Sequence, residues 1–116
     1  MTKIARAALE RAKAATPEQG EQAKRIATLT DRPCSRWSDR NRLLMAIEGT
    51  ADARGYKQWI EAGRKVKAGE KAFYILIPCI KGERGEDGRT AGECYGFRGC
   101  PVFGIEQTDD IAQVAP

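Results

Sequence analysis

The sequence predicts an α+β domain in which N-terminal helices pack on a small antiparallel sheet. Segments with apolar residues at helical spacing fill the first half of the chain, up to about residue 63. The second half holds a β-branched and aromatic segment at 71–78 and another strand-like segment at 93–105. Helices followed by strands are typical of α+β architectures, and 116 residues fit a single domain.

The first two helices are expected at 2–15 and from Thr16 to about Leu29. Thr16 supplies a capping hydroxyl, Pro17 stands at the first helical position, and Gln19 follows the cap by three residues, which together are typical of a helix start. Both helices carry few apolar residues, so the sequence predicts that they are loosely attached.

A third helix is the best defined in the sequence. The hydroxyl of Ser38 can cap a helix over 39–48, and the glycine that follows ends it. Its leucines face inward, which leaves Arg40 and Arg42 toward water or a ligand. A short helical turn closed by glycine is expected at 55–63.

The strands are expected to begin with a hairpin. A short strand at 65–66 and a turn at 67–70 lead into the long strand at 71–78. The glycine-rich, charged segment 81–92 then forms a second hairpin loop. The return strand at 93–105 contains glycines and a proline that predict a bulge or a break splitting it in two.

The composition excludes several classes of enzyme. The chain has no histidine, and so no Ser-His-Asp triad, Cys-His pair or HExxH zinc site. No spacing of carboxylates distinguishes an acid–base or two-metal site from surface charge. We therefore expect a protein that is not an enzyme and that needs no cofactor.

The basic residues are unevenly distributed. The net charge is +4, but residues 31–71 carry ten basic and six acidic residues, whereas 72–116 carry four and seven. A polyanionic partner is therefore expected to contact the first two thirds of the chain. A solvated charged surface is the alternative interpretation.

The cysteines favour neither disulfides nor a metal site. Cys34, Cys79, Cys94 and Cys100 form no CxxC pair, which makes buried or loop thiols the expected state, with a four-thiolate zinc site assembled from separate strands as the alternative. The longest apolar runs are far shorter than a membrane span, and the N-terminus lacks the apolar core of a secretory signal. A soluble, cytoplasmic protein without membrane contact is expected.

Four segments carry a family resemblance: WSDRNRLL at 37–44, GYKQW at 55–59, GRKVKAGEK at 63–71 and VFGIEQT at 102–108. Their order and spacing resemble the N-terminal single-stranded-DNA-binding domain of the ArdC-type antirestriction proteins, which are carried on plasmids and other mobile elements. That family shows YS..N..LL, GY..W...GR.VKKGEK and VFD..QT. The resemblance covers about residues 34–110.

The resemblance implies a domain organisation. Residues 1–30 form a helical extension, 31–110 the ArdC-like domain and 111–116 a disordered tail. Longer family members continue into a zinc metalloprotease-like domain carrying HExxH, which is absent here, so the resemblance implies the DNA-binding part alone. Gly104 stands where the family has the aspartate of VFD.

The predicted function is non-specific binding of single-stranded DNA, with an implied role in protecting transferred DNA. Such binding needs cations along the phosphates and aromatic faces for the bases. The candidate residues share these properties, with one amide among them: Arg36, Trp37, Arg40, Asn41, Arg42, Tyr56, Arg64, Lys65, Lys67, Lys71, Tyr74 and Arg98.

Several interpretations stay open at this stage. Asn41 either contacts a base or phosphate or is a buried amide that fixes a neighbouring segment, and Trp59 is expected in the core. The lysines of the first hairpin could simply protect a solvated sheet edge. The alternative function is a protein-interaction domain that binds a host enzyme or partner subunit through the sheet face or the N-terminal helices.

Overall fold

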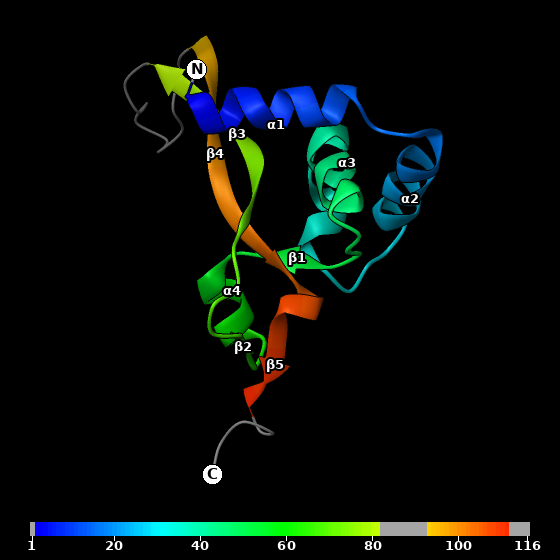
Figure 1. Ribbon diagram of the computed structural model, residues 1–116, viewed down its shortest axis with the longest axis vertical. Helices are drawn as coiled ribbons and strands as arrows, with labels where there is room; N and C mark the ends of the chain where they lie inside the picture. The colour runs from blue at the N-terminus through cyan, green and yellow to red at the C-terminus, as the bar shows by residue number, and fades with distance from the viewer. Residues whose placement is uncertain (1, 82–92, 112–116) are drawn as a thin grey trace, which may run out of the picture.

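The computed structural model describes residues 2–81 and 93–111, and these form an α+β fold as the sequence predicts. The predicted loop at 81–92 and tail at 111–116 lie almost wholly outside the described residues. The elements in chain order are α1 (Lys3–Lys13), α2 (Pro17–Ala27), η1 (Pro33–Arg36), α3 (Asp39–Ile47), β1 (Ala53–Arg54), α4 (Tyr56–Glu61), β2 (Arg64–Val66), β3 (Phe73–Lys81), β4 (Glu93–Gly104), η2 (Ile105–Gln107) and β5 (Thr108–Asp110). Figure 1 shows a long twisted ribbon of β3 and β4, with α1 crossing it, α2 and α3 to one side, and α4, β2 and β5 at the far end.

The helix starts are those that the sequence predicts. The backbone N–H of Gln19 donates to the Thr16 hydroxyl at 3.2 Å, and the Gln19 side chain accepts from the Thr16 N–H at 2.9 Å, a reciprocal capping box. Ser38 accepts from the Asn41 N–H at 3.2 Å and so caps α3. Local hydrogen bonds explain why these starts can be read from the sequence.

The long ribbon is one antiparallel pair. β4 is the central strand of a three-stranded sheet with the order β1-β4-β3. It runs unbroken past Pro101, so the predicted division into two strands is wrong. The predicted bulge occurs nearer the start of β4, where Cys79 pairs with Gly96 but the next residue pairs with Cys94.

The predicted hairpin between the lysine-rich strand and the long strand is wrong. β2 pairs instead with β5, in a separate two-stranded antiparallel sheet. Lys65 lies opposite Asp109, and Arg64 lies opposite Asp110. A basic strand therefore lies beside an acidic one from the end of the described chain.

The core has two clusters, one for each face of the ribbon. Residues opposite one another in a register share a face, so Ile75 and Cys100 face one way, and Leu76 and Gly99 the other. The first face packs in a cluster of Ile26, Cys34, Met45, Ala53, Phe73, Ile75 and Val102. The second packs in a cluster of Ala5, Ala8, Leu44 and Leu76, joined by Leu9, Ala12 and Phe97.

Helix α1 is firmly part of the fold, contrary to the expected loose attachment. Ala5 and Ala8 are buried against the ribbon, and Ile4 lies so close to Gly99 that a Cβ there would be 2.6 Å from its Cγ2. Small residues let the helix approach the strand closely, so few large apolar side chains are needed. α2 in turn buries Ala23 and Ile26, and it packs against α3.

The free edge of β3 is closed by Asn41. Its side chain donates to the Leu76 carbonyl at 2.9 Å and accepts from the Leu76 N–H at 2.8 Å. A strand edge offers unpaired backbone groups, and here a buried amide pairs both groups of one residue. α3 is thereby fixed along the edge, with Leu44 reaching one cluster and Met45 the other.

A glycine is needed at position 104 because there is no room for a side chain, and not because the backbone adopts a positive φ. Its φ is −77°, but a Cβ there would lie 2.8 Å from the Thr50 hydroxyl oxygen and 2.9 Å from the Thr50 Cβ. Thr50 therefore occupies the volume that a side chain at position 104 would need. This explains in physical terms why the aspartate of the family pattern does not fit here.

Substituting Gly104→Ala should destabilise the domain by about 1–3 kcal/mol, because a buried backbone segment or Thr50 must shift. Urea unfolding followed by circular dichroism would measure the loss. Gly20→Ala is the matched control, since nothing lies within 4 Å of a Cβ at that helical position. It should raise stability by about 0.5–1 kcal/mol. Equal effects of the two substitutions would contradict the steric explanation.

Candidate nucleic-acid interface

A hollow of about 510 Å³ brings together part of the predicted site at the far end of the molecule. We call it the Tyr56 hollow, and it is lined by Tyr56, Lys65, Val66, Lys67, Ala68, Glu70, Phe103 and Asp109. Tyr56 is 49% exposed at the first position of α4. An aromatic ring thus stands open to solvent beside two lysines.

The position of Tyr56 follows from the burial of Trp59. Trp59 is 1% exposed, and its Nε1 donates to the Phe103 carbonyl at 2.8 Å, which ties α4 to β4. The guanidinium of Arg54 covers the indole at 4.8 Å from the ring centroid. Trp59 is therefore a core residue, as predicted, and Tyr56 stays outside it.

The cations of β2 are divided between solvent and interior. Lys65 is exposed, whereas Arg64 is half-buried and donates to the Thr108 hydroxyl at 2.7 Å and to the Thr108 carbonyl at 3.1 Å. This matches the alternation expected of a strand. Lys67 lies 4.0 Å from the Asp109 carboxylate, so it already has a weak ionic partner.

A second depression lies beyond the connection that links β2 to β3. We call it the Tyr74 cavity; its volume is about 420 Å³, and it is lined by Arg11, Glu48, Thr50, Lys71, Ala72, Phe73, Tyr74, Gly104, Glu106 and Gln107. The connection contributes Glu70 to the Tyr56 hollow and Lys71 to this cavity. The two depressions are thus adjacent along the chain.

The walls of the Tyr74 cavity are held by polar contacts. Arg11 of α1 forms an ion pair with Glu48 at the end of α3. The Thr50 hydroxyl lies 3.2 Å from a Glu106 carboxylate oxygen. The Gln107 amide accepts from the Gly104 N–H at 2.9 Å and donates to the Lys71 carbonyl at 2.8 Å, which fixes the backbone of Lys71.

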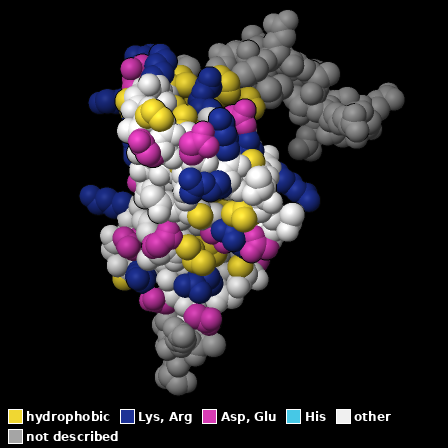
Figure 2. Space-filling model, turned by 90° about the vertical axis from the view of Figure 1, so that its right-hand side faces the viewer, with side chains coloured by type: hydrophobic (Ala, Val, Ile, Leu, Met, Phe, Trp, Pro, Cys, Tyr) yellow, Lys and Arg dark blue, Asp and Glu magenta, His cyan; other side chains and the backbone are white. Residues whose placement is uncertain are grey.

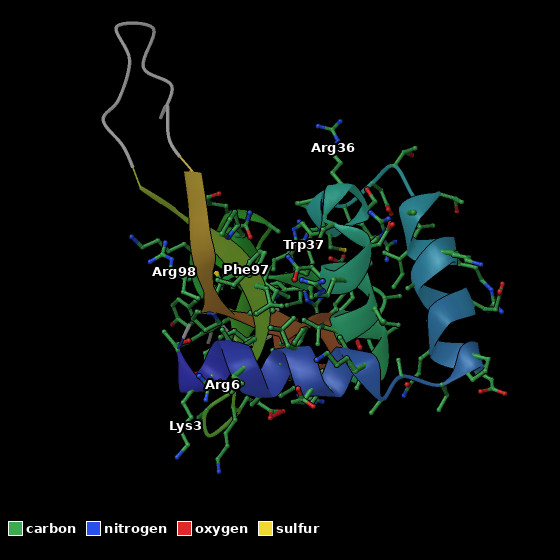
Figure 3. All side chains as sticks on the ribbon, turned by 90° about the horizontal axis from the view of Figure 1, so that it is seen from above. Lys3, Arg6, Arg36, Trp37, Phe97 and Arg98 are labelled. Atoms are coloured by element: carbon green, nitrogen blue, oxygen red, sulfur yellow. The ribbon has the colours of Figure 1, made fainter. Side chains whose placement is uncertain are left out.

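Three further predicted arginines do not join either depression. Arg40 stacks over Phe97 at 5.8 Å from the ring centroid. In Figure 3, Arg36 projects from η1 and Arg98 from β4, in different directions. Trp37 lies between the ribbon and α3 and packs against the first core cluster, half-buried.

Asn41 and Arg42 have structural partners. The Asn41 amide is fully used on β3, so of the two open interpretations the buried amide describes it. Arg42 is 14% exposed at its side chain and donates to the carbonyls of Ser35 and Trp37. The expectation that Arg42 faces water or a ligand is therefore wrong, because it fixes η1 to α3.

Many of the cations outside these contacts are unpaired. Within residues 2–81 and 93–111, these exposed cations have no carboxylate partner: Lys3, Arg6, Arg25, Arg36, Arg40, Lys57, Lys65, Lys71 and Arg98. The side of the molecule with α2 differs, since Figure 2 shows acidic and basic side chains interleaved there. That side offers no single-sign surface for a polyanion.

The described residues contain no group of side chains with the composition of a metal site. No cluster of three or more Cys, Asp or Glu side chains that could hold a metal occurs in the part of the chain that the structure describes. Burial raises the pKa of the Cys34 thiol, which lies in the first core cluster, and such a thiol is a poor nucleophile. A hydrogen bond from Arg32 lowers the pKa of the exposed Asp31 carboxyl.

Sequence reasoning missed the acidic residues of both depressions. Asp109 and Glu70 line the Tyr56 hollow, and Glu48 and Glu106 line the Tyr74 cavity. Asp109 belongs to the short Thr-Asp-Asp run that follows the last predicted strand, and all three residues of this run are polar, so the run lacks the alternation that predicts a strand. No signal in the sequence pairs that run with β2.

None of the helices that the structure describes is long and apolar enough to cross a bilayer. No family model matches the sequence, and a search of curated proteins finds no match either. Among solved structures, the chain is similar to the metal-free crystal structure of the antirestriction protein ArdC from plasmid R388, with a TM-score of 0.49 and 20% identity. The match covers 82% of this chain and 42% of that one, so this chain spans less than half of that protein's length.

Proposed function

We propose that this domain binds single-stranded DNA, chiefly through phosphate charge and base stacking. The observation that carries the proposal is the half-exposed ring of Tyr56 in the Tyr56 hollow, beside Lys65, which is exposed and has no carboxylate partner in the part of the chain that the structure describes. Stacking of a base on an aromatic ring contributes roughly 1–3 kcal/mol, and it tolerates any base. The lysine supplies the charge that a neighbouring phosphate needs.

Lys71 and Tyr74 extend the proposed surface. They line the Tyr74 cavity, and Lys71 has no carboxylate partner among the described residues. A strand that crosses the connection between Lys67 and Lys71 would meet an aromatic ring and a lysine on each side of it. Asn41, Arg42 and Arg64 are left out of this surface, because their polar atoms bind the protein itself.

The biological role that we propose is the one implied by the four family-like segments. A domain of this kind would coat DNA that enters a cell as a single strand and protect it, including against restriction. The segments at 55–59 and 63–71 contribute Tyr56, Lys65 and Lys71, so the resemblance and the surface coincide in these residues. This role rests on analogy of sequence.

Fluorescence anisotropy with a labelled oligo-dT at several salt concentrations tests the binding. Contact of Lys65 and Lys71 with two phosphates should give a slope of about −1.4 in log affinity against log salt, from about −0.7 per phosphate. A slope near zero, or no binding at low salt, would refute the proposal.

A second candidate function is binding of a partner protein at the same end of the molecule. Ile60 is 45% exposed and Ile111 37% exposed, and the Ile111 N–H donates to the Gly63 carbonyl just after α4. Exposed apolar side chains near one another are typical of contact surfaces. Unlike DNA binding, association through Ile60 and Ile111 would strengthen or stay constant as salt rises, and Ile60→Asp would abolish it.

A further inference from the structure

Tyr74 lines two depressions that differ in chemistry, the Tyr74 cavity and a smaller one beside α1. On one side a small hollow of about 170 Å³ is lined by Ile4, Ala7, Ala8, Arg11 and Tyr74, which is mostly apolar. On the other side lies the cavity proper, with its carboxylates and Lys71. Tyr74 is half-buried between them, on the face of the ribbon that it shares with Leu76.

The groups of the Tyr74 cavity that remain available to a ligand are mainly carboxylate oxygens, which accept hydrogen bonds, and the ammonium group of Lys71. The Gln107 amide is used at both its oxygen and its nitrogen, so it cannot bind a ligand without releasing Gly104 or Lys71. Glu106 is exposed and has no cationic partner among the described residues. One of its oxygens lies 3.2 Å from the Thr50 hydroxyl, which shares its single hydrogen with the Asp52 carbonyl at 3.0 Å, and the other oxygen has no protein partner among the described residues.

A planar ligand with an amino group and a nearby negative charge matches these properties. The ring can stack on Tyr74, the amino group can donate to the free oxygen of Glu106, and the charge can pair with Lys71. A nucleotide of a single strand has all three parts. The cavity volume of about 420 Å³ lies within the usual range for a small-molecule site.

The carboxylate makes the site selective among bases. Cytosine, adenine and guanine carry an exocyclic amino group that donates hydrogen bonds, whereas thymine presents carbonyl oxygens at the corresponding positions. A carboxylate repels those oxygens; the N3–H of thymine is a donor, but O2 and O4 flank it on both sides and oppose the approach of a carboxylate, whereas an amino group is reached from the open edge of the base. Stacking and phosphate contacts alone would not produce this difference.

We propose that the Tyr74 cavity holds one base of a bound single strand and prefers an amino-bearing base to thymine, with Glu106 as the specificity-determining residue. This inference rests on the proposed DNA-binding function and adds base preference to it. Most of the strand is still held without regard to sequence, through Tyr56 and the lysines.

The test compares labelled oligo-dC and oligo-dT of equal length, because these two pyrimidine strands stack weakly and differ at the exocyclic group. The wild-type domain should bind oligo-dC roughly tenfold more tightly at equal salt. Glu106→Gln keeps the acceptor for Thr50 and removes the charge, so the preference should fall to about twofold or less while oligo-dT binds no more weakly than before. Glu18→Gln, an exposed position on α2, is the control with the same charge change and should keep the preference.

The outcomes separate the two proposals. Equal affinity of the wild-type domain for oligo-dC and oligo-dT overturns the base preference and leaves DNA binding standing. A preference that survives in the Glu106→Gln variant overturns the assignment to Glu106. Absence of binding to both oligonucleotides overturns DNA binding itself, and the base preference with it.

Discussion

Reversing the charges of Lys65 and Lys71 together should weaken binding of single-stranded DNA by roughly a thousandfold at low salt. A lysine about 4 Å from a phosphate gains about 1 kcal/mol in water, and a glutamate at the same place loses about as much. Each reversal is then a change of about 2 kcal/mol, or roughly thirtyfold. Anisotropy titration of the Lys65→Glu, Lys71→Glu double variant against oligo-dT measures the effect.

The control for this prediction changes the net charge equally at another place. Lys13 and Lys24 are exposed on α1 and α2, and each lies near a glutamate of its own helix. The Lys13→Glu, Lys24→Glu variant should lose only the small part of the affinity that depends on net charge. If both double variants weaken binding equally, the two depressions are not the contact surface.

Replacing Asn41 by alanine should destabilise the domain by about 2–6 kcal/mol. The substitution leaves the N–H and the carbonyl of Leu76 buried without partners, and each such group costs about 1–3 kcal/mol. Thermal and urea unfolding of the variant would measure the loss. For a domain near the lower end of the usual stability range, about 5 kcal/mol, a loss near the upper limit would leave it only partly folded.

Ser38→Ala is the control for Asn41, because it acts on the same helix without touching β3. It removes the cap of α3 and should cost about 1 kcal/mol. If Asn41→Ala costs no more than Ser38→Ala but abolishes DNA binding, Asn41 is a binding residue and its contact with β3 is incidental.

The elements that the sequence predicts correctly depend on contacts between near neighbours. Thr16 and Gln19, three residues apart, make the capping box, and Ser38 caps α3 through the N–H of Asn41, also three residues away. The glycines after α3 and α4 adopt positive φ angles of 80° and 84°, as helix-ending glycines do. Such signals need no knowledge of the rest of the fold.

The features that the sequence does not predict depend on distant contacts. β2 pairs with β5, more than forty residues later, so a strand that looks like half of a local hairpin belongs to another sheet. The firm packing of α1 depends on Gly99, whose lack of a side chain admits Ile4. Neither the distance in sequence nor the composition of α1 indicates these contacts.

For the candidate site, too, the sequence predicts one part and only the fold reveals the other. Tyr56 and Trp59 lie one helical turn apart, and only the fold decides that Trp59 is buried and Tyr56 exposed. The basic residues around Asn41 look equivalent in sequence, yet Arg42 binds backbone carbonyls while Arg40 lies over Phe97. Residue type therefore identifies candidates, and the fold determines which of them remain available to a ligand.

The pairing of β2 with β5 has a consequence for how the surface responds to ions. Asp109 stands opposite Lys65 in the register and 4.0 Å from Lys67, so the protein itself supplies an anion to its basic strand. A phosphate that reached Lys67 in the proposed complex would replace Asp109 as its partner, and Asp109 would then be open to cations from solution, which would offset part of the cation release from the DNA. The number of lysines that contact phosphates and the number of ions exchanged on binding would therefore differ.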